Sequence, residues 1–238
     1  LHADVCEIYT DVDGVYTADP RVVPNAKKME EVTYDEMLEM ASLGAKVLHS
    51  RCVEIAKKYG VELLVCSSLN RNSGTIVREN TKMEKMLISG VAADKNVAKI
   101  RVAGLGNDPD STFKLLNLLD KNNLNIDVMI QSLGKDGTKS VSFTVAKTDL
   151  NRTLEVLSAN KGQLGIQKLD SDEKVAKVSV IGAGIRSHSG VAAKMFGALA
   201  NAGINTEMVT TSEIRITALI NEDYTDLAMR AIHETFLE

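Results

Sequence analysis

The chain has 238 residues, of which 44% are hydrophobic and 25% charged, an ordinary composition for a folded globular protein of about two domains. Its formal net charge is −4 and its basic residues do not cluster, which argues against a nucleic-acid partner or an anionic membrane surface. No apolar run reaches the ~18 residues of a membrane span, and the first residues lack a signal-peptide pattern. Cysteines at positions 6, 52 and 66 show no metal-ligand spacing and indicate reduced thiols in a cytoplasmic protein.

The first segment, V-C-E-I-Y-T at residues 5–10, is expected to form a strand. A turn with an Asp-Gly signal follows at 11–15, and then a polar stretch at 16–21. Polar side chains just past the carboxyl end of a strand are where open α/β sheets bind ligands. Spacing alone leaves a ligand site and a plain solvated turn equally open.

Two helices and a further strand follow. Residues 33–36, T-Y-D-E, form a capping box that starts a helix ending near Gly44. A second helix is expected at 50–59, with Gly60 as its C-cap. The run V-E-L-L-V-C-S at 61–67 predicts a strand buried on both faces, as in a parallel sheet. The alternation of strand and helix indicates an α/β domain.

One pattern then occurs twice, at residues 99–145 and 177–220. Each copy has an alternating apolar run, a Gly-x-Gly turn, a helical stretch and two further strands. The pattern predicts a pair of ferredoxin-like βαββαβ units with helices on one face of an antiparallel sheet.

The ends of the two copies differ. Helices at 151–160 and 225–236 close the copies, and a short strand is expected at 165–169, followed by a charged connection at 170–174. The second copy has no final strand of its own, so one unit is expected to borrow a strand, for which residues 86–92 are the candidate.

Several of these stretches together resemble one family. The run T-D-V-D-G-V-Y-T-A-D-P-R at 10–21 resembles the nucleotide-binding segment of aspartate kinases, members of the amino acid kinase family. Residues 34–49, Y-D-E-M-L-E-M-A-S-L-G-A-K-V-L-H, are also similar to that family. The double repeat resembles its paired C-terminal ACT domains, and V-T-T-S-E-I-R-I at 209–216 resembles the signature of the second one.

The resemblance covers the whole chain and implies an α/β fold: a partial amino acid kinase domain with a parallel sheet at 1–82, then ACT domains at 83–172 and 173–238. The implied function is the ATP-site and regulatory portion of an aspartate kinase, which phosphorylates the β-carboxylate of L-aspartate in lysine, threonine and methionine biosynthesis. The family's N-terminal phosphate-cradling segment is absent, so we expect a piece of a longer chain that carries no catalytic residues and is inactive alone.

The resemblance also implies an ATP site, with Mg²⁺ in the full enzyme. Tyr16 offers a flat wall for adenine, and Arg21 and Lys46 offer cations for the phosphates. Spacing alone would make Lys46 an exposed lysine after a helix. The residues implied to bind ATP are Thr10, Asp11, Tyr16, Thr17, Ala18, Asp19, Pro20, Arg21, Lys46 and Val47.

The repeats resemble amino-acid sensors controlled by lysine, threonine or both. Free N–H groups where residues 107–112 enter a helix favour a carboxylate, and Asp127, at the start of the next strand, suits an α-ammonium. Asp110 and Ser189 depart from the glycine and proline of many relatives, and His188 is expected to be a loop residue. A ligand shared between chains implies a homodimer. The implied effector residues are Asn107, Asp110, Thr112, Asn125, Ile126, Asp127 and Gln131.

Two other readings remain. One is a regulatory amino-acid-sensing subunit or fragment without chemistry, against which residues 1–80 argue. The other is a dinucleotide enzyme, because Gly182-Ala183-Gly184 follows a strand and Glu207 lies about 20 residues on. Ser187 stands in place of the third glycine and the topology that follows does not suit that motif.

Overall fold

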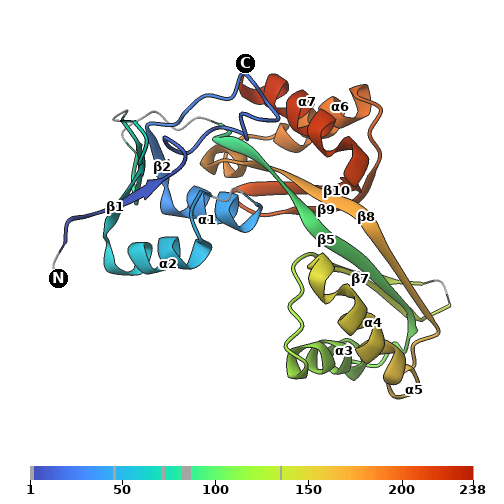
Figure 1. The fold of residues 1–238 in the computed structure, drawn as a ribbon. Helices are drawn as coiled ribbons and strands as arrows, with labels where there is room; N and C mark the ends of the chain where they lie inside the picture. Colours follow the sequence, from blue (N-terminus) through green and yellow to red (C-terminus); the bar gives the residue numbers. More distant parts are fainter. Residues whose placement is uncertain (1–2, 45–46, 71–72, 82–86, 135, 238) are drawn as a thin grey trace. The chain divides into compact units, whose positions relative to one another are not determined.

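The computed structural model describes residues 3–44, 47–70, 73–81, 87–134 and 136–237. The chain forms two compact units (Figure 1). The larger unit combines Leu1–Asp94 with Lys177–Glu238, and the smaller unit is Lys95–Ala176. The larger unit combines two separate segments and the smaller unit is continuous, so these units divide the chain differently, and the domain limits 1–82, 83–172 and 173–238 stay a prediction.

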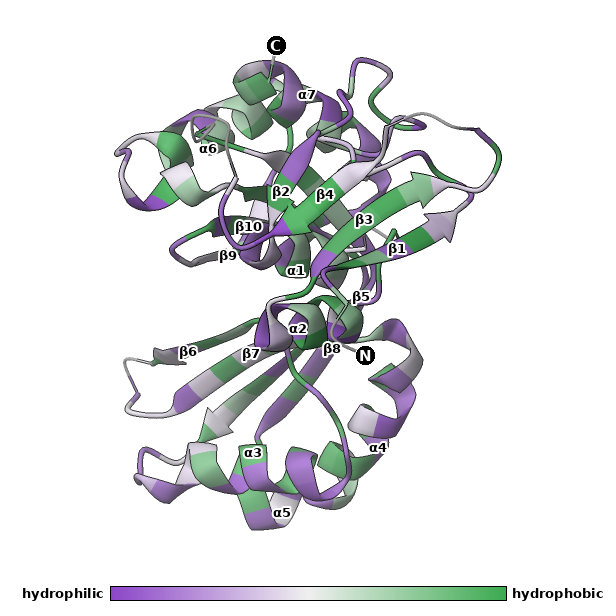
Figure 2. Ribbon diagram, turned by 90° about the vertical axis from the view of Figure 1, so that its left-hand side faces the viewer, coloured by the Kyte–Doolittle hydropathy of each residue, from purple (hydrophilic) through white to green (hydrophobic). Residues whose placement is uncertain are grey.

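The larger unit begins with a four-stranded sheet in the order β1-β3-β4-β2. Strand β1 is parallel to β3, and β2 is parallel to β4, whereas β3 and β4 are antiparallel. Its elements are β1 (Val5–Thr10), β2 (Glu31–Thr33), α1 (Tyr34–Ser42), α2 (Ser50–Tyr59), β3 (Glu62–Ser67) and β4 (Thr75–Arg78). Figure 2 shows hydrophobic residues along β3 and β4, and the core beneath them includes Met37, Val53 and Val65.

The local signals for the helices are confirmed. Thr33 Oγ1 accepts from the Glu36 N–H and the Glu36 carboxylate accepts from the Thr33 N–H, which is the predicted capping box. Gly60 ends α2 with φ 66°, a conformation that favours glycine. The prediction for β3 was wrong in one respect: buried residues alternate along it, so β3 is buried on one face only.

The second repeat lies in the larger unit. Its strands are ordered β5-β8-β10-β9, and α6 and α7 contribute to the same core. The elements are β5 (Gly90–Leu105, whose first residues belong here), β8 (Lys168–Ile181), the 3-10 turns η2 (Ala183–Arg186) and η3 (Glu222–Tyr224), α6 (Val191–Asn201), β9 (Thr206–Thr211), β10 (Arg215–Asn221) and α7 (Thr225–Leu237). Val91 packs with Val178, Met195 and Ile232, so the start of β5 is the borrowed strand. Met86, part of the predicted range, lies outside the described residues.

The smaller unit holds the first repeat, with strands in the order β6-β7-β5-β8. Its elements, besides parts of β5 and β8, are α3 (Asp110–Lys121), β6 (Met129–Leu133), β7 (Lys139–Val145), the 3-10 turn η1 (Lys147–Asp149), α4 (Leu150–Ala159) and α5 (Lys161–Leu164). Strand β7 is antiparallel to both β5 and β6. Figure 2 shows α3 and α4 on the same face of the strands, and Ile100, Leu115, Phe143 and Leu157 fill the core between the layers.

Within each repeat the strands follow the ferredoxin-like order, β6-β7-β5-β8 in the first and β9-β10-β8-β5 in the second, which confirms the repeat. Equivalent hydrogen bonds close them: the Gln167 N–H donates to Ala103 O, and the Ser89 N–H donates to Ile181 O. Each bond stands just before a Gly-x-Gly turn. A Cβ on Gly104 would lie 2.4 Å from the Gln167 side chain, and its φ of 83° is one that favours glycine.

Two strand boundaries differ from the predictions. Residues 170–174, expected as a connection, lie within β8, and the strand expected at 165–169 is the start of β8 at Lys168. Asn125–Asp127 do not begin a strand, because β6 starts at Met129. The N–H groups of Asp127 and Val128 both bond to Thr144, through its O and Oγ1, so two residues oppose one and regular pairing begins later.

Candidate functional site

The nucleotide segment, residues 10–21, begins at the carboxyl edge of two parallel strands. Thr10 ends β1 opposite Ser67, the last residue of β3, and the Ser68 N–H donates to Thr10 O. Thr10 Oγ1 accepts from the Val12 N–H, which starts the turn. This edge is the place where open α/β sheets bind ligands.

The middle of the nucleotide segment is hydrogen-bonded to Thr75 of β4. Its hydroxyl accepts from the Val15 N–H at 2.8 Å and donates to Met29 O at 2.6 Å. The Tyr16 hydroxyl donates to Asp13 Oδ1 at 2.9 Å, and burial followed by this carboxylate raises the pKa of Tyr16. The tyrosine ring is therefore held in place next to the turn.

The predicted ATP-binding residues divide by exposure. Thr17 and Ala18 are buried, at 5% and 4% exposure, and cannot present their side chains to a ligand in this conformation. Arg21 is exposed and pairs with Asp19, Nη2 to Oδ2, at 2.7 Å. The hydrogen bond from Arg21 holds the pKa of Asp19 below its usual range. Asp11 and Pro20 are exposed and Val47 is half-buried, whereas Lys46 lies outside the described residues.

Helix α1, which follows the nucleotide segment in the chain, contacts the second repeat through two glutamates. Glu36 is 6% exposed, and its Oε1 accepts from Ser89 Oγ and from the Ala183 N–H of η2 at 3.1 Å. Glu39 Oε2 pairs with Arg215 of β10 at 2.8 Å. The sequence marked Glu36 only as a cap, since no local pattern carries a contact across about 150 residues.

In the first repeat, the effector loop is residues 107–112. Asp110 begins α3, and its N–H donates to Asp108 Oδ1 at 3.1 Å. Thr112 Oγ1 donates to Gln131 Oε1 at 2.6 Å, so the structure brings these two predicted residues together across α3 and β6. Asn107 is exposed at the entrance to the loop.

The other predicted effector residues precede β6. Asn125 and Asp127 are exposed and Ile126 is half-buried. They are held by the Asp127 N–H, which donates to Thr144 O at 3.1 Å.

Sequence reasoning missed Lys139 beside the effector loop. Its ammonium donates to Asp108 O at 2.8 Å and to Ser111 Oγ at 3.3 Å. Lys139 pairs with Leu105, which ends β5 directly before the loop. The signal that could have found it is the register of β7 against β5, because that register carries the lysine to the start of α3.

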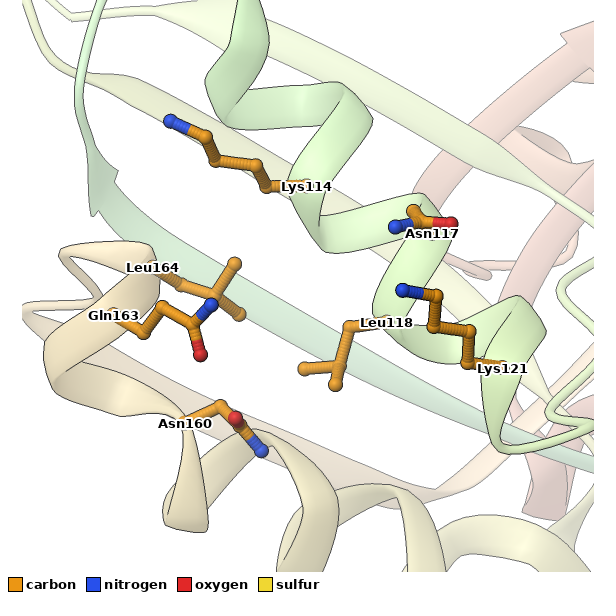
Figure 3. A pocket seen from close by; sticks show the side chains of 7 residues that line it. All are labelled: Lys114, Asn117, Leu118, Lys121, Asn160, Gln163 and Leu164. Carbon is orange, nitrogen blue, oxygen red and sulfur yellow. The ribbon is translucent and has the colours of Figure 1, made fainter.

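A hollow of about 110 Å³ lies on the helical side of the first repeat (Figure 3). Its lining residues are Lys114, Asn117, Leu118, Lys121, Asn160, Gln163 and Leu164. None of them belongs to the predicted effector set. Among the described residues, no group of three or more His, Cys, Asp or Glu could hold a metal ion, and no helix is long and apolar enough to cross a membrane.

Two family models match the chain. The amino acid kinase family matches residues 1–67, and the ACT domain matches residues 178–236. The aspartokinase of Pseudomonas aeruginosa is 45% identical over 99% of this chain. The chain spans about 58% of the length of that relative.

Solved structures agree with these matches. A chain in the crystal structure of aspartokinase alpha and beta subunits is 43% identical, with a TM-score of 0.59, over 63% of this chain and 98% of its own length. E. coli aspartokinase III, in a complex with lysine and aspartate, is 27% identical with a TM-score of 0.80, over 100% of this chain and 53% of its own length.

Proposed function

Because this chain belongs to the aspartokinase family, we propose that it is the ATP-site and regulatory portion of an aspartate kinase. The whole protein would transfer the γ-phosphoryl group of ATP to the β-carboxylate of L-aspartate, under feedback control by lysine, threonine or both. The observation that carries the proposal is the combination of a kinase-family segment and an ACT segment in one chain, with residues 10–21 at the carboxyl edge of β1 and β3.

In the nucleotide segment, the exposed and half-buried residues of the predicted set would take distinct tasks. The Tyr16 ring would stack on adenine, while Thr10 and Asp11 would accept and donate hydrogen bonds around the ribose and base. Arg21 would exchange Asp19 for a phosphate, and Lys46 would bring a second cation, because phosphoryl transfer depends on positioning and charge neutralisation. Mg²⁺ would be held mainly by the phosphates, since the described residues include no cluster of metal ligands.

Catalysis would need residues beyond this chain. Val5 and Tyr9 of β1 are 45% and 62% exposed, and Ile55 and Tyr59 of α2 are 50% and 69% exposed. Large apolar side chains are thus exposed on β1 and on α2, which suits contact with the remaining part of a kinase domain. We expect the 238-residue chain alone to phosphorylate no aspartate.

On the regulatory side, the effector would bind the first repeat and the protein would form a homodimer through its ACT domains. The N–H groups at the start of α3 face a carboxylate favourably, and Asp127 can accept from an α-ammonium. The lysine complex of E. coli aspartokinase III supports an amino acid as the ligand class. Lysine and threonine both remain candidates.

The test uses the full-length protein with Arg21→Ala. Loss of a charge-assisted bond to phosphate should raise the KM for ATP about tenfold to a hundredfold. Arg152→Ala in α4, an exposed arginine of the smaller unit, is the matched control and should leave that KM unchanged. No ATP-dependent aspartate phosphorylation by the wild type, or the same KM for ATP in both variants, would contradict the proposal.

A second candidate is a regulatory subunit without catalysis. It is suggested by the chain in the structure of aspartokinase alpha and beta subunits, because 98% of that chain's length matches this one. The match covers 63% of the present chain. The kinase-family match at residues 1–67 counts against it. Intact mass of the purified native protein distinguishes a long kinase chain from a separate regulatory chain.

A further inference from the structure

Helix α7 of the second repeat contacts the nucleotide segment and the residues after it at three points. Thr17 Oγ1 lies 2.9 Å from His233 Nε2, and both residues are buried. Arg230 Nε donates to Val22 O at 2.9 Å. Lys27 Nζ donates to Leu237 O at 3.2 Å, so the contacts run from near the middle of the helix to its end.

Thr17 is the centre of these contacts. Its N–H donates to Lys27 O, and its hydroxyl accepts from the Lys27 N–H, each at 2.9 Å. Its carbonyl accepts from the Val91 N–H at 2.7 Å, at the start of β5. Since the hydroxyl already accepts from Lys27, its bond to His233 completes its partners inside a buried site.

Apolar packing supports the same arrangement. Ala18 and Val23 belong to the hydrophobic core of the second repeat, together with Ala228 and Ile232 of α7. The nucleotide segment is therefore exposed at Asp11 and Arg21, whereas Thr17 and Ala18 are buried against the second repeat. A shift of α7 would displace Thr17 and Ala18, which the backbone joins directly to the Tyr16–Arg21 stretch.

From this geometry we infer that His233 is a positioning residue for nucleotide binding: it holds Thr17, and through Thr17 the Tyr16–Arg21 backbone, in the conformation that receives ATP. The inference rests on the proposed nucleotide role of residues 10–21. His233 does not touch the ligand. It acts by keeping a buried threonine hydroxyl in one orientation. Loss of the imidazole therefore weakens the binding of ATP and leaves the binding of aspartate unchanged.

The experiment measures steady-state kinetics of the full-length protein with His233→Leu and His233→Gln. Leucine fills the space without a polar atom, and the KM for ATP should rise about three- to tenfold, the equivalent of one buried hydrogen bond. The kcat and the KM for aspartate should stay within about twofold. Glutamine places an amide near the position of Nε2 and should restore most of the ATP affinity.

Ile232→Val is the matched control, because Ile232 neighbours His233 on α7 and is buried without contacting Thr17 through a polar group. Because it trims the core shared with Ala18 but removes no polar partner of Thr17, it should raise the KM for ATP less than His233→Leu does. If His233→Leu does not fold, Arg230→Ala, at an exposed position, replaces it and should raise the KM for ATP about two- to threefold.

The outcomes separate the two claims. A wild-type protein that does not use ATP removes the proposed function and this inference with it. A wild-type protein that uses ATP, with folded His233→Leu or Arg230→Ala showing an unchanged KM for ATP, overturns the inference alone. Equal rises for His233→Leu and Ile232→Val also overturn it, because they would reflect general loosening of α7.

Discussion

The two repeats have the same strand order but different surroundings at their Gly-x-Gly turns. In the first repeat, Gly106 and Asn107 are exposed, and the loop that follows bonds to itself and to Lys139 and Gln131 of the neighbouring strands. In the second repeat, Gly184 is buried, and a Cβ there would lie 2.6 Å from Leu87 Cα. The Ala183 N–H already donates to a carboxylate of the chain itself, that of Glu36.

This difference separates two roles that the duplicated sequence alone does not distinguish. Among the described residues, the hydrophobic core of the first repeat consists of residues of that repeat. The core of the second repeat includes Ala18 and Val23 from the nucleotide side. We therefore expect the first repeat to bind the effector and the second to carry the response to the nucleotide segment.

The largest expected effect concerns Glu36, whose carboxylate accepts from the Ala183 N–H in the Gly-x-Gly turn of the second repeat. Glu36→Ala removes the carboxylate half of the capping box of α1 and leaves the Ala183 N–H without its acceptor, a loss of about 2–4 kcal/mol in the free energy of unfolding. Urea unfolding followed by circular dichroism measures it. Asp35→Ala, on the same helical turn, should cost less than about 1 kcal/mol, because its pair with Lys57 is exposed. Similar losses in both variants would mean that Glu36 acts only locally.

The next effect tests which repeat binds the effector. Leu124 and Val128 are buried on either side of Asp127 as Ile204 and Met208 are around Glu207, so the two acidic residues occupy equivalent positions. Asp127→Ala should weaken lysine or threonine binding by about 1.5–3 kcal/mol, or tenfold to a hundredfold. Glu207→Ala should change the affinity less than about twofold. Calorimetry on both variants decides it, and a larger loss for Glu207→Ala would reverse the assignment of roles.

Much of the architecture follows from local patterns. The Thr33 capping box, Gly60 and the doubled Gly-x-Gly pattern predicted helices and repeats that the structure confirms. These signals were readable because capping and alternation act over a few residues.

The features that sequence reasoning missed depend on distant partners. Glu36 bonds to Ala183, 147 positions away, and Thr17 bonds to His233, 216 positions away. No periodic pattern in the sequence predicts contacts over such separations. Thr17 was predicted to bind the nucleotide because it lies in the run at 10–21 that resembles the family's nucleotide-binding segment. Its side chain is instead turned into the second repeat.

The smallest effect compares two carboxylates, half-buried Asp19 of the nucleotide segment and exposed Asp136 of the first repeat. Asp19 has a lowered pKa chiefly because Arg21 donates to it, whereas the pKa of Asp136, in the first repeat, is lowered chiefly by the Thr138 N–H. A depressed folded-state pKa stabilises the fold above the unfolded pKa near 3.9, and this contribution disappears as the pH falls through the folded value. Salt screens an exposed ion pair more than a neutral hydrogen bond. In NMR titrations at about 0.05 and 1 M salt, the pKa of Asp19 should therefore rise toward its ordinary value, and that of Asp136 should hardly move. ATP should shift the Asp19 value in the same direction, since a phosphate would take Arg21 from it, and a pKa of Asp19 indifferent to both salt and ATP would show that Arg21 never leaves its partner.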